Sequence, residues 1–196
     1  MPPPNPQRKS AQGPRGNTKS GMDLNPAQQN KLKALFVKLN QAIDQGHASQ
    51  ALTKLNELSK RMPNEVNIHL AIGRAEATLG RHPDAIAAYK RATELAPKSP
   101  EIRYQYGVAL QKGGLYEESL VEFERVLYLD PDHFYALRHK SSVITDLGRI
   151  EDGYKVWLEL AEKYRDVNLD DDKRTAIAIS GSRYAPKLLD AQESID

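Results

Sequence analysis

Glycine returns every 34 residues in this chain of 196 residues, at Gly46, Gly80, Gly114 and Gly148. Each of these glycines follows a segment whose apolar residues recur with a helical period. Glycine adopts the left-handed backbone conformation at little cost, and this conformation commonly ends a helix. We therefore predict that each glycine ends one helix and allows the chain to reverse. A fixed period of this length indicates an array of similar structural units, which restricts the fold more than any other feature of the sequence.

Three further positions recur after each glycine and predict a second helix in every unit. A small residue is followed four residues later by a large apolar residue, and three residues beyond it by another apolar residue. Side chains at these spacings lie on one face of a helix, where the small residue permits a neighbouring helix to approach. The recurring residues are Ala51, Leu55 and Leu58; Ala85, Tyr89 and Ala92; Ser119, Phe123 and Val126; and Gly153, Trp157 and Leu160. We expect the three aromatic members to be core anchors at equivalent sites.

The helix before each glycine has a small residue of its own in three of the four units. This residue is Gly73, Gly107 or Ser141, whereas the first unit has Leu39 at the same place. A glycine inside a helix costs about 1 kcal/mol relative to alanine. We expect close packing against the second helix of the unit to offset this cost.

Glycine, small, aromatic, small and proline at these offsets resemble the tetratricopeptide repeat, with the closing prolines at Pro63, Pro97 and Pro131. Leu39 and Arg165 depart from the pattern, as is typical of terminal repeats. The resemblance implies an all-α fold, a right-handed α-solenoid of antiparallel helix pairs with a C-terminal capping helix. The first helix of each pair then lines a concave inner face. The four repeats cover residues 32–65, 66–99, 100–133 and 134–167.

The N-terminal segment differs in composition from the repeats. Residues 1–22 contain five prolines and four basic residues with no acidic residue, which predicts a disordered basic tail because such a segment cannot bury a core. Asn25 followed by Pro26 is typical of a helix N-cap with proline at the first helical position. We therefore place the repeat domain at residues 23–167.

Residues 168–196 do not continue the repeat and are predicted to form a capping helix and a tail. Asp170 and the two aspartates after it are suited to cap a helix that covers the last repeat. We expect Gly181 and Pro186 to break this helix, and Leu188 with Leu189 to begin a second short helix.

Composition excludes several classes of function. The absence of cysteine excludes disulfides, thiolate metal sites and a cysteine nucleophile, and fits a reducing compartment. Outside the tail, 24 basic residues face 26 acidic residues, so we expect no specific nucleic-acid partner. No apolar run is long enough to span a bilayer. We expect a cytoplasmic protein.

The resemblance also implies which side chains face the groove. Amides suit the backbone of an extended peptide, aromatic rings suit its apolar side chains, and Arg74, Lys112 and Arg138 favour carboxylates. We therefore expect a protein or peptide partner with acidic character, the alternative being a solvated inner face. The predicted ligand contacts are Asn40, Asn67, Arg74, Tyr104, Gln105, Gln111, Lys112, Tyr135, Arg138 and His139. Lys33, Phe36, Leu70, Val108 and Ser142 complete the predicted lining.

Chaperone-binding members of the family grip acidic C-terminal tails through two lysines, two asparagines and an arginine. The corresponding positions here are Phe36, Asn40, Ala71, Glu101 and Gln105. Only Asn40 matches, and Glu101 places a negative charge where the clamp requires a positive one. We therefore predict that this chain has no such clamp.

Catalysis is not predicted. His139 and Ser142 lie three residues apart on a predicted helix, but no third residue orients the imidazole and no oxyanion donors are evident. The five histidines do not pair at metal-ligand spacing. We expect neither an enzyme nor a cofactor or metal site.

Two functions remain open. The first is a scaffold or adaptor that binds a peptide segment of a partner in its groove. The second is the N-terminal recruiting module of a larger transferase, since similar repeats precede sulfotransferase and sugar-transferase domains. Self-association through an end of the stack is a further possibility.

Overall fold

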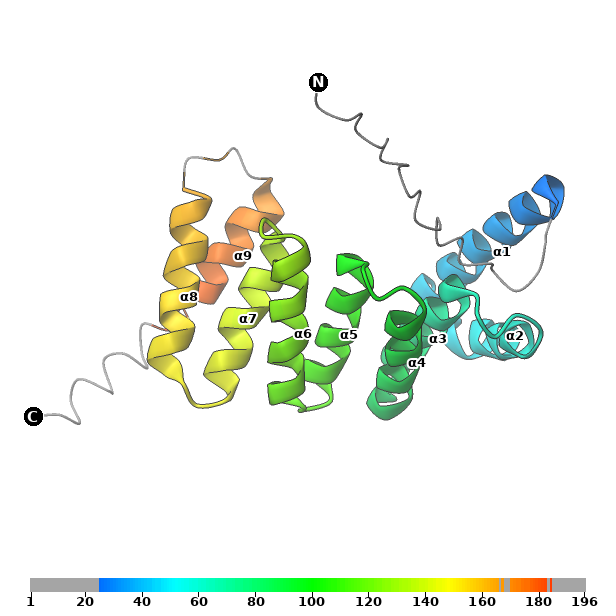
Figure 1. Cartoon of the computed structure of the whole chain (residues 1–196), viewed down its shortest axis with the longest axis horizontal. Coiled ribbons are helices and arrows are strands. Elements are labelled where there is room, and N and C mark those ends of the chain that lie inside the picture. Colours follow the sequence, from blue (N-terminus) through cyan, green and yellow to red (C-terminus); the bar gives the residue numbers. More distant parts are fainter. Residues whose placement is uncertain (1–24, 166, 168–169, 183, 185–196) are drawn as a thin grey trace, which may run out of the picture.

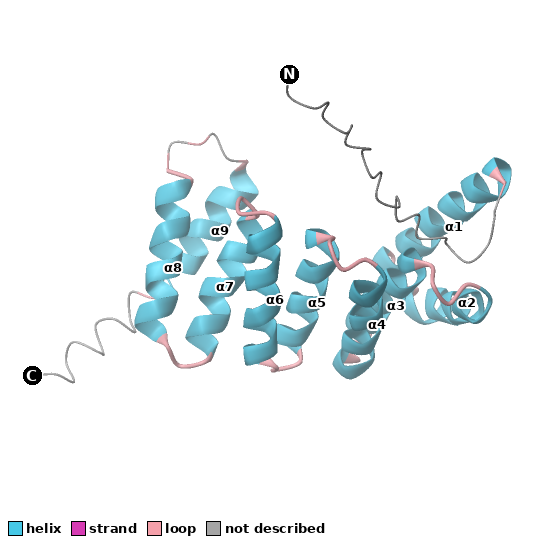
Figure 2. Ribbon diagram, viewed as in Figure 1, coloured by secondary structure: helices cyan, strands magenta, loops and turns pink. Residues whose placement is uncertain are grey.

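The computed structural model describes residues 25–165, 167, 170–182 and 184. These residues form helices and no strand, arranged as a curved row of antiparallel pairs (Figure 1) with short connecting loops (Figure 2). The all-α solenoid is thereby confirmed. The helices are α1 (Pro26–Asp44), α2 (Ala48–Arg61), α3 (Val66–Thr78), α4 (His82–Leu95), α5 (Pro100–Lys112), α6 (Tyr116–Leu129), α7 (Phe134–Asp146), α8 (Ile150–Lys163) and α9 (Asp171–Ser182).

The first helix begins where the sequence predicts. The Asn25 side chain accepts a hydrogen bond from the backbone N–H of Gln28, 2.9 Å away, and the Gln28 side chain accepts one from the N–H of Asn25. This reciprocal cap satisfies two backbone donors that a helix N-terminus otherwise leaves unpaired. Residues 1–22, predicted to be a disordered tail, lie outside the described residues.

The four recurring glycines end the first helix of each pair, as predicted. They have φ between 73° and 85°, and no other described residue has a positive φ. At each turn the residue after the glycine donates its N–H back to a carbonyl in the last turn of the helix, for example from His47 to Ala42 at 2.8 Å. These bonds satisfy carbonyls that have no partner within the helix.

Aromatic rings of the second helices rest on glycines of the first helices. A Cβ atom at Gly73 would lie 2.9 Å from the Tyr89 ring, and one at Gly107 would lie 2.9 Å from the Phe123 ring. Both distances are shorter than real contacts allow, so only glycine permits this approach. The predicted packing is therefore confirmed for these two pairs. Phe123 is 0% exposed and lies at the centre of its core cluster.

Side-chain donors also join neighbouring repeats at the closing prolines. His69 Nε2 donates to the carbonyl of Pro63 at 2.7 Å, and Arg103 Nε donates to that of Pro97 at 2.8 Å. Arg103 further pairs with the buried Glu122 at 2.8 Å. A buried carboxylate is stable only when it is paired, so Arg103 holds α6 and the loop before α5 together.

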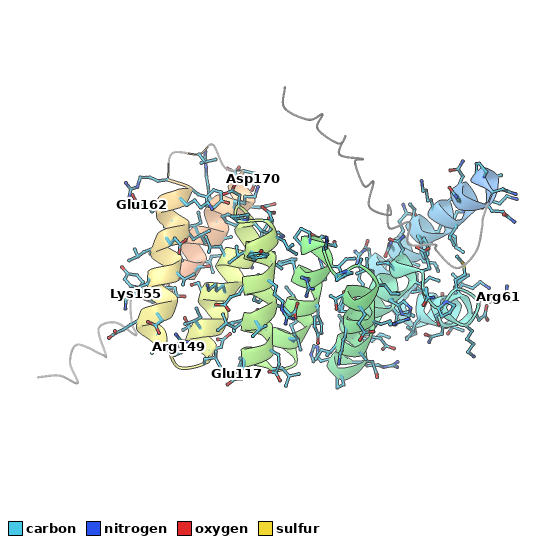
Figure 3. All side chains as sticks on the ribbon, in the orientation of Figure 1. Arg61, Glu117, Arg149, Lys155, Glu162 and Asp170 are labelled. Atoms are coloured by element: carbon cyan, nitrogen blue, oxygen red, sulfur yellow. The ribbon has the colours of Figure 1, made fainter. Side chains whose placement is uncertain are left out.

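The last repeat is covered by α9, which packs on α8 and α7. Asp170 accepts a hydrogen bond from the N–H of Lys173 at 2.8 Å, as the predicted N-cap requires. From Asp170, which Figure 3 labels beside its start, α9 runs to Ser182 and so ends one residue past Gly181, which faces the Trp157 ring. Pro186 and the predicted second short helix lie outside the described residues.

Trp157 differs from the two anchors before it. It is half-buried, and its indole N–H donates to the carbonyl of Ile177 at 3.1 Å. Beside it, the hydroxyl of the buried Tyr184 bonds to Ser141 and Thr145 of α7. Trp157 therefore attaches α9 to the stack rather than filling the interior of its own repeat.

Replacing Phe123 with alanine is expected to lower the free energy of unfolding by about 3–5 kcal/mol, because a fully buried ring is lost and the cavity does not refill. Urea unfolding followed by circular dichroism measures this change. Tyr128→Ala is the control, since Tyr128 lies on the same helix and is 88% exposed. Equal losses in the two variants would contradict the packing described for Phe123.

Replacing Trp157 with alanine should loosen α9 more than the repeats before it, because the variant loses both the ring under Gly181 and the bond to Ile177. Amide hydrogen exchange by mass spectrometry measures this local opening. We expect faster exchange in α9 and unchanged exchange in α5. Uniform acceleration along the chain would show that Trp157 supports the whole fold instead.

Candidate functional site

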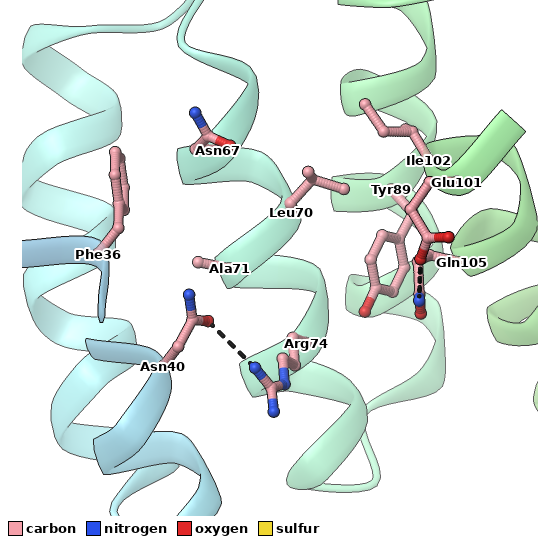
Figure 4. A pocket seen from close by; sticks show the side chains of 10 residues that line it. All are labelled: Phe36, Asn40, Asn67, Leu70, Ala71, Arg74, Tyr89, Glu101, Ile102 and Gln105. Atoms are coloured by element: carbon pink, nitrogen blue, oxygen red, sulfur yellow. Dashed lines mark hydrogen bonds between the residues drawn. The ribbon is translucent and has the colours of Figure 1, made fainter. Parts of the chain in front are cut away.

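Two adjoining pockets lie on the inner face of the solenoid, where α3 and α5 face each other. The first has a volume of about 450 Å³ and extends to α1 (Figure 4). Its apolar lining consists of Phe36, Leu70, Ala71, Tyr89 and Ile102. Its polar lining consists of Asn40, Asn67, Arg74, Glu101 and Gln105. The pocket thus combines apolar surface with a few polar groups, which is typical of a binding site.

One of the two charged side chains of the first pocket is paired with a carboxylate outside the pocket. Arg74 forms an ion pair with Asp44 and donates a hydrogen bond to Asn40 Oδ1 at 3.4 Å. Gln105 Nε2 donates to Glu101 at 2.9 Å, as Figure 4 shows. Because Asp44 neutralises Arg74, the carboxylate of Glu101 is the excess charge here.

The second pocket continues along α3 and α5 toward their C-terminal ends and has a volume of about 220 Å³. It shares Arg74, Tyr89 and Gln105 with the first pocket. Ala77, Thr78, Val108, Ala109 and Lys112 complete its lining. Lys112 is exposed and forms no ion pair with the described residues. The second pocket is therefore positively charged, and no carboxylate lines it.

Five of the ten predicted ligand contacts line these pockets, namely Asn40, Asn67, Arg74, Gln105 and Lys112. Of the further lining predicted from the sequence, Phe36, Leu70 and Val108 also lie there. Sequence reasoning missed Tyr89, which it treated only as a core anchor, and Ile102. It considered Ala71 and Glu101 only as clamp positions. The alternation of glycine and aromatic residues predicts that the Tyr89 ring is buried, but it does not indicate where its hydroxyl emerges.

The other five predicted contacts form a separate cluster on α5 and α7. Tyr104 is half-buried among aromatic rings, and its ring centre lies 5.6 Å from that of His139 and 6.4 Å from that of Tyr135. The His139 ring stacks on Phe123 at 5.4 Å. Tyr104 and His139 therefore cover the core of the third repeat, and Tyr135, 38% exposed, is the most accessible ring among them.

A chain of hydrogen bonds crosses this cluster from α7 to α5 and back. Arg138 donates to His139 Nε2 at 3.2 Å, and His139 Nδ1 donates to Gln111 Oε1 at 2.8 Å. Gln111 Nε2 then donates to Asp146 at 3.2 Å and to Ser142 at 3.4 Å. The remaining Arg138 side-chain surface borders a small cavity between α7 and α9. These polar groups hold two neighbouring inner helices together and leave few donors for a ligand.

Burial decides the protonation of this cluster. Burial, together with the nearby cations Arg138 and Lys112, which act in the same direction, lowers the pKa of His139 to about 4. Burial also raises the pKa of Tyr104 to about 12. At neutral pH the imidazole is therefore uncharged and the phenol keeps its proton, as the hydrogen-bond chain requires.

Neither a metal centre nor a membrane span is present in the described part of the chain. No three histidine, cysteine, aspartate or glutamate side chains there gather closely enough to hold a metal ion. None of its helices combines the length and the apolar character needed to cross a bilayer.

The chain matches the model of a known repeat family. The family model described as "Tetratricopeptide repeat" matches residues 38–100 and again residues 70–136. The two overlapping matches together extend over half of the chain. A comparison with curated proteins gives no match.

Solved structures with the same fold include three of different kinds. The crystal structure of MamA has 19% identity and a TM-score of 0.62, with 74% of this chain and 80% of that chain covered. The first TPR domain of Spaghetti (RPAP3), bound to an HSP90 peptide, has 22% identity and a TM-score of 0.56, with 61% and 94% covered. An O-GlcNAc transferase mutant from Thermobaculum terrenum has 19% identity and a TM-score of 0.63, with 72% of this chain and only 28% of that chain covered. Identities this low establish a common fold alone.

Acidification should destabilise the protein through His139. A histidine whose folded pKa lies below its unfolded value near 6.5 binds its proton more readily in the unfolded chain, so stability falls as the pH drops from about 6.5 toward 4. At pH 5 the loss should be about 2 kcal/mol. Urea unfolding at several pH values measures it, and His139→Gln should remove this component of the pH dependence. Parallel profiles for wild type and variant would contradict the burial of His139.

Proposed function

Because the chain belongs to the tetratricopeptide repeat family, we propose that it is a non-catalytic scaffold or adaptor that holds an extended peptide of a partner protein between α3 and α5. The observation that carries this proposal is the pair of adjoining pockets on the inner face. They continue one another along the two helices through Arg74, Tyr89 and Gln105. An elongated site of this shape suits a peptide in an extended conformation.

The lining provides contacts for both the backbone and the side chains of such a peptide. Asn40 accepts from Arg74 through Oδ1, which leaves its Nδ2 group as a donor toward the pocket (Figure 4). Exposed Asn67 donates through Nδ2 to Glu65 at 2.8 Å and offers its Oδ1 as an acceptor at the rim. Phe36, Leu70 and Ile102 provide apolar surface for peptide side chains. Amides for the backbone and apolar surface for alternate side chains are the usual means of recognising an extended peptide.

A structural neighbour supports the general mode of binding without identifying the ligand. The RPAP3 domain is bound to an HSP90 peptide. In the present chain Glu101 lies in the first pocket, and Phe36 and Ala71 occupy two other clamp positions. We therefore propose a peptide different from the acidic C-terminal tails that a clamp selects.

The proposal is tested by selecting binders from a phage-displayed library of random dodecapeptides. Asn67→Trp places a large ring at the rim of the first pocket, where Asn67 is exposed enough to accept it without disturbing the core. Peptides selected on the wild type should bind this variant at least about tenfold more weakly, a loss of about 1.4 kcal/mol. Fluorescence anisotropy with the synthetic peptides measures the affinities.

The matched control is Lys90→Trp, which adds the same ring on α4 at an exposed position that lines neither pocket. It should bind the selected peptides as the wild type does, and both variants should melt near the wild-type temperature. If Asn67→Trp bound the peptides with wild-type affinity, the peptide site would lie elsewhere on the molecule.

A second candidate is a recruiting module within a larger transferase. The observation in its favour is that the repeats of this chain superpose on 28% of the Thermobaculum terrenum O-GlcNAc transferase mutant. Sequencing the gene beyond codon 196 tests this proposal. A reading frame that continues into a transferase domain would support it, and a stop codon at that point would exclude it.

The proposed setting is the cytoplasm, for which the cysteine-free composition is suited. Self-association through an end of the stack also remains a proposal. Light scattering over a range of protein concentrations tests it, because a mass that rises with concentration indicates association.

A further inference from the structure

Tyr89 lines both pockets, and its hydroxyl has no hydrogen-bond partner among the described residues. The side chain is only 5% exposed, and its ring is fixed against Gly73. Figure 4 shows the Tyr89 ring between the side chains of Arg74 and Gln105. The hydroxyl is not among the fully buried side-chain atoms that lack a partner, so it reaches the pocket surface, where it can donate to a ligand group.

Packing alone does not require this hydroxyl. The equivalent residue one repeat later is Phe123, which fills the same place against Gly107 with no polar group. His139 covers that ring and closes the space above it. The residue equivalent to His139 one period earlier is Gln105, which lines the pockets and leaves the space above Tyr89 open.

The charges around the hydroxyl differ between the two pockets. On the side of the first pocket, the Glu101 carboxylate is the uncompensated charge, because Arg74 is paired with Asp44. In the second pocket, Lys112 is the uncompensated charge. Burial raises the pKa of Tyr89 to about 12, so the hydroxyl keeps its proton at neutral pH and can donate it.

We propose that the second pocket binds the carboxylate of an aspartate or glutamate side chain of the peptide ligand. The Tyr89 hydroxyl donates a hydrogen bond to this carboxylate, and Lys112 forms an ion pair with it. Glu101 repels a carboxylate from the first pocket, which therefore takes an apolar or basic side chain. The inference rests on the proposed function and defines the orientation in which the peptide binds.

The test begins with the same library of random dodecapeptides. Peptides selected on the wild type should be enriched in aspartate or glutamate at one position relative to the unselected library. Synthetic versions with that residue changed to glutamine or asparagine should bind about tenfold more weakly, because hydrogen bonds to charged groups are stronger than those to neutral ones. We call the ratio of the two dissociation constants, that of the changed peptide over that of the acidic peptide, the acid preference of the site.

Tyr89→Phe removes only the hydroxyl and keeps the ring against Gly73, so the fold is retained. This variant and Lys112→Gln should each reduce the acid preference to about twofold or less. The controls are Tyr106→Phe and Lys90→Gln, which make the same chemical changes at positions that line neither pocket. Both controls should keep the wild-type preference.

Selected peptides without acidic enrichment, or an acid preference unchanged by Tyr89→Phe, would overturn the inference. Loss of the preference in Lys112→Gln alone would overturn the assignment of the hydroxyl. In each of these cases the proposed function stands as long as Asn67→Trp still weakens binding. Wild-type binding by Asn67→Trp would instead reject the proposed function itself.

Discussion

The contact between an aromatic ring and a helical glycine is the interaction on which the rest of this structure depends. Tyr89 on Gly73 and Phe123 on Gly107 bring the two helices of a repeat closer than any side chain at the glycine would allow. The helix loses about 1 kcal/mol of intrinsic stability at each glycine, and the buried ring contributes several times that amount. Because the spacing within each pair is fixed in this way, the inner helices are presented side by side and can form one continuous surface.

The inner surface is closed or open according to whether another side chain covers the aromatic ring of each repeat. In the third repeat Phe123 is covered by His139 of the following repeat, which joins a hydrogen-bond chain that ends at Asp146. In the second repeat no ring covers Tyr89, and the pockets open there. The same packing rule thus produces a closed surface on one repeat and an open one on its neighbour. The difference comes from Gln105 and His139, which are one period apart.

The sequence predicts the features that arise within one repeat and fails for those that depend on neighbouring repeats. The glycine turns and the Phe123 anchor follow from local spacing, and both were predicted. The burial of His139 was not predicted, because it depends on a ring contributed by another helix. Trp157 is a similar case, since its role follows from α9, whose position no periodicity indicates. Half of the predicted groove residues line the pockets for the same reason: the period identifies the inner face, but not which part of it remains open.

The position of α9 has a consequence for how the array can grow. This helix lies on α8 where the first helix of another repeat would stack, and Trp157 and Tyr184 attach it there through bonds to Ile177 and to Ser141. Gene duplication that inserts a repeat between the second and fourth units preserves every one of these contacts. Duplication after the fourth unit separates α9 from its partners and requires a new set. The α9 contacts therefore act as an end-stop on this side of the stack, and they are kept only when an added repeat enters before the fourth unit.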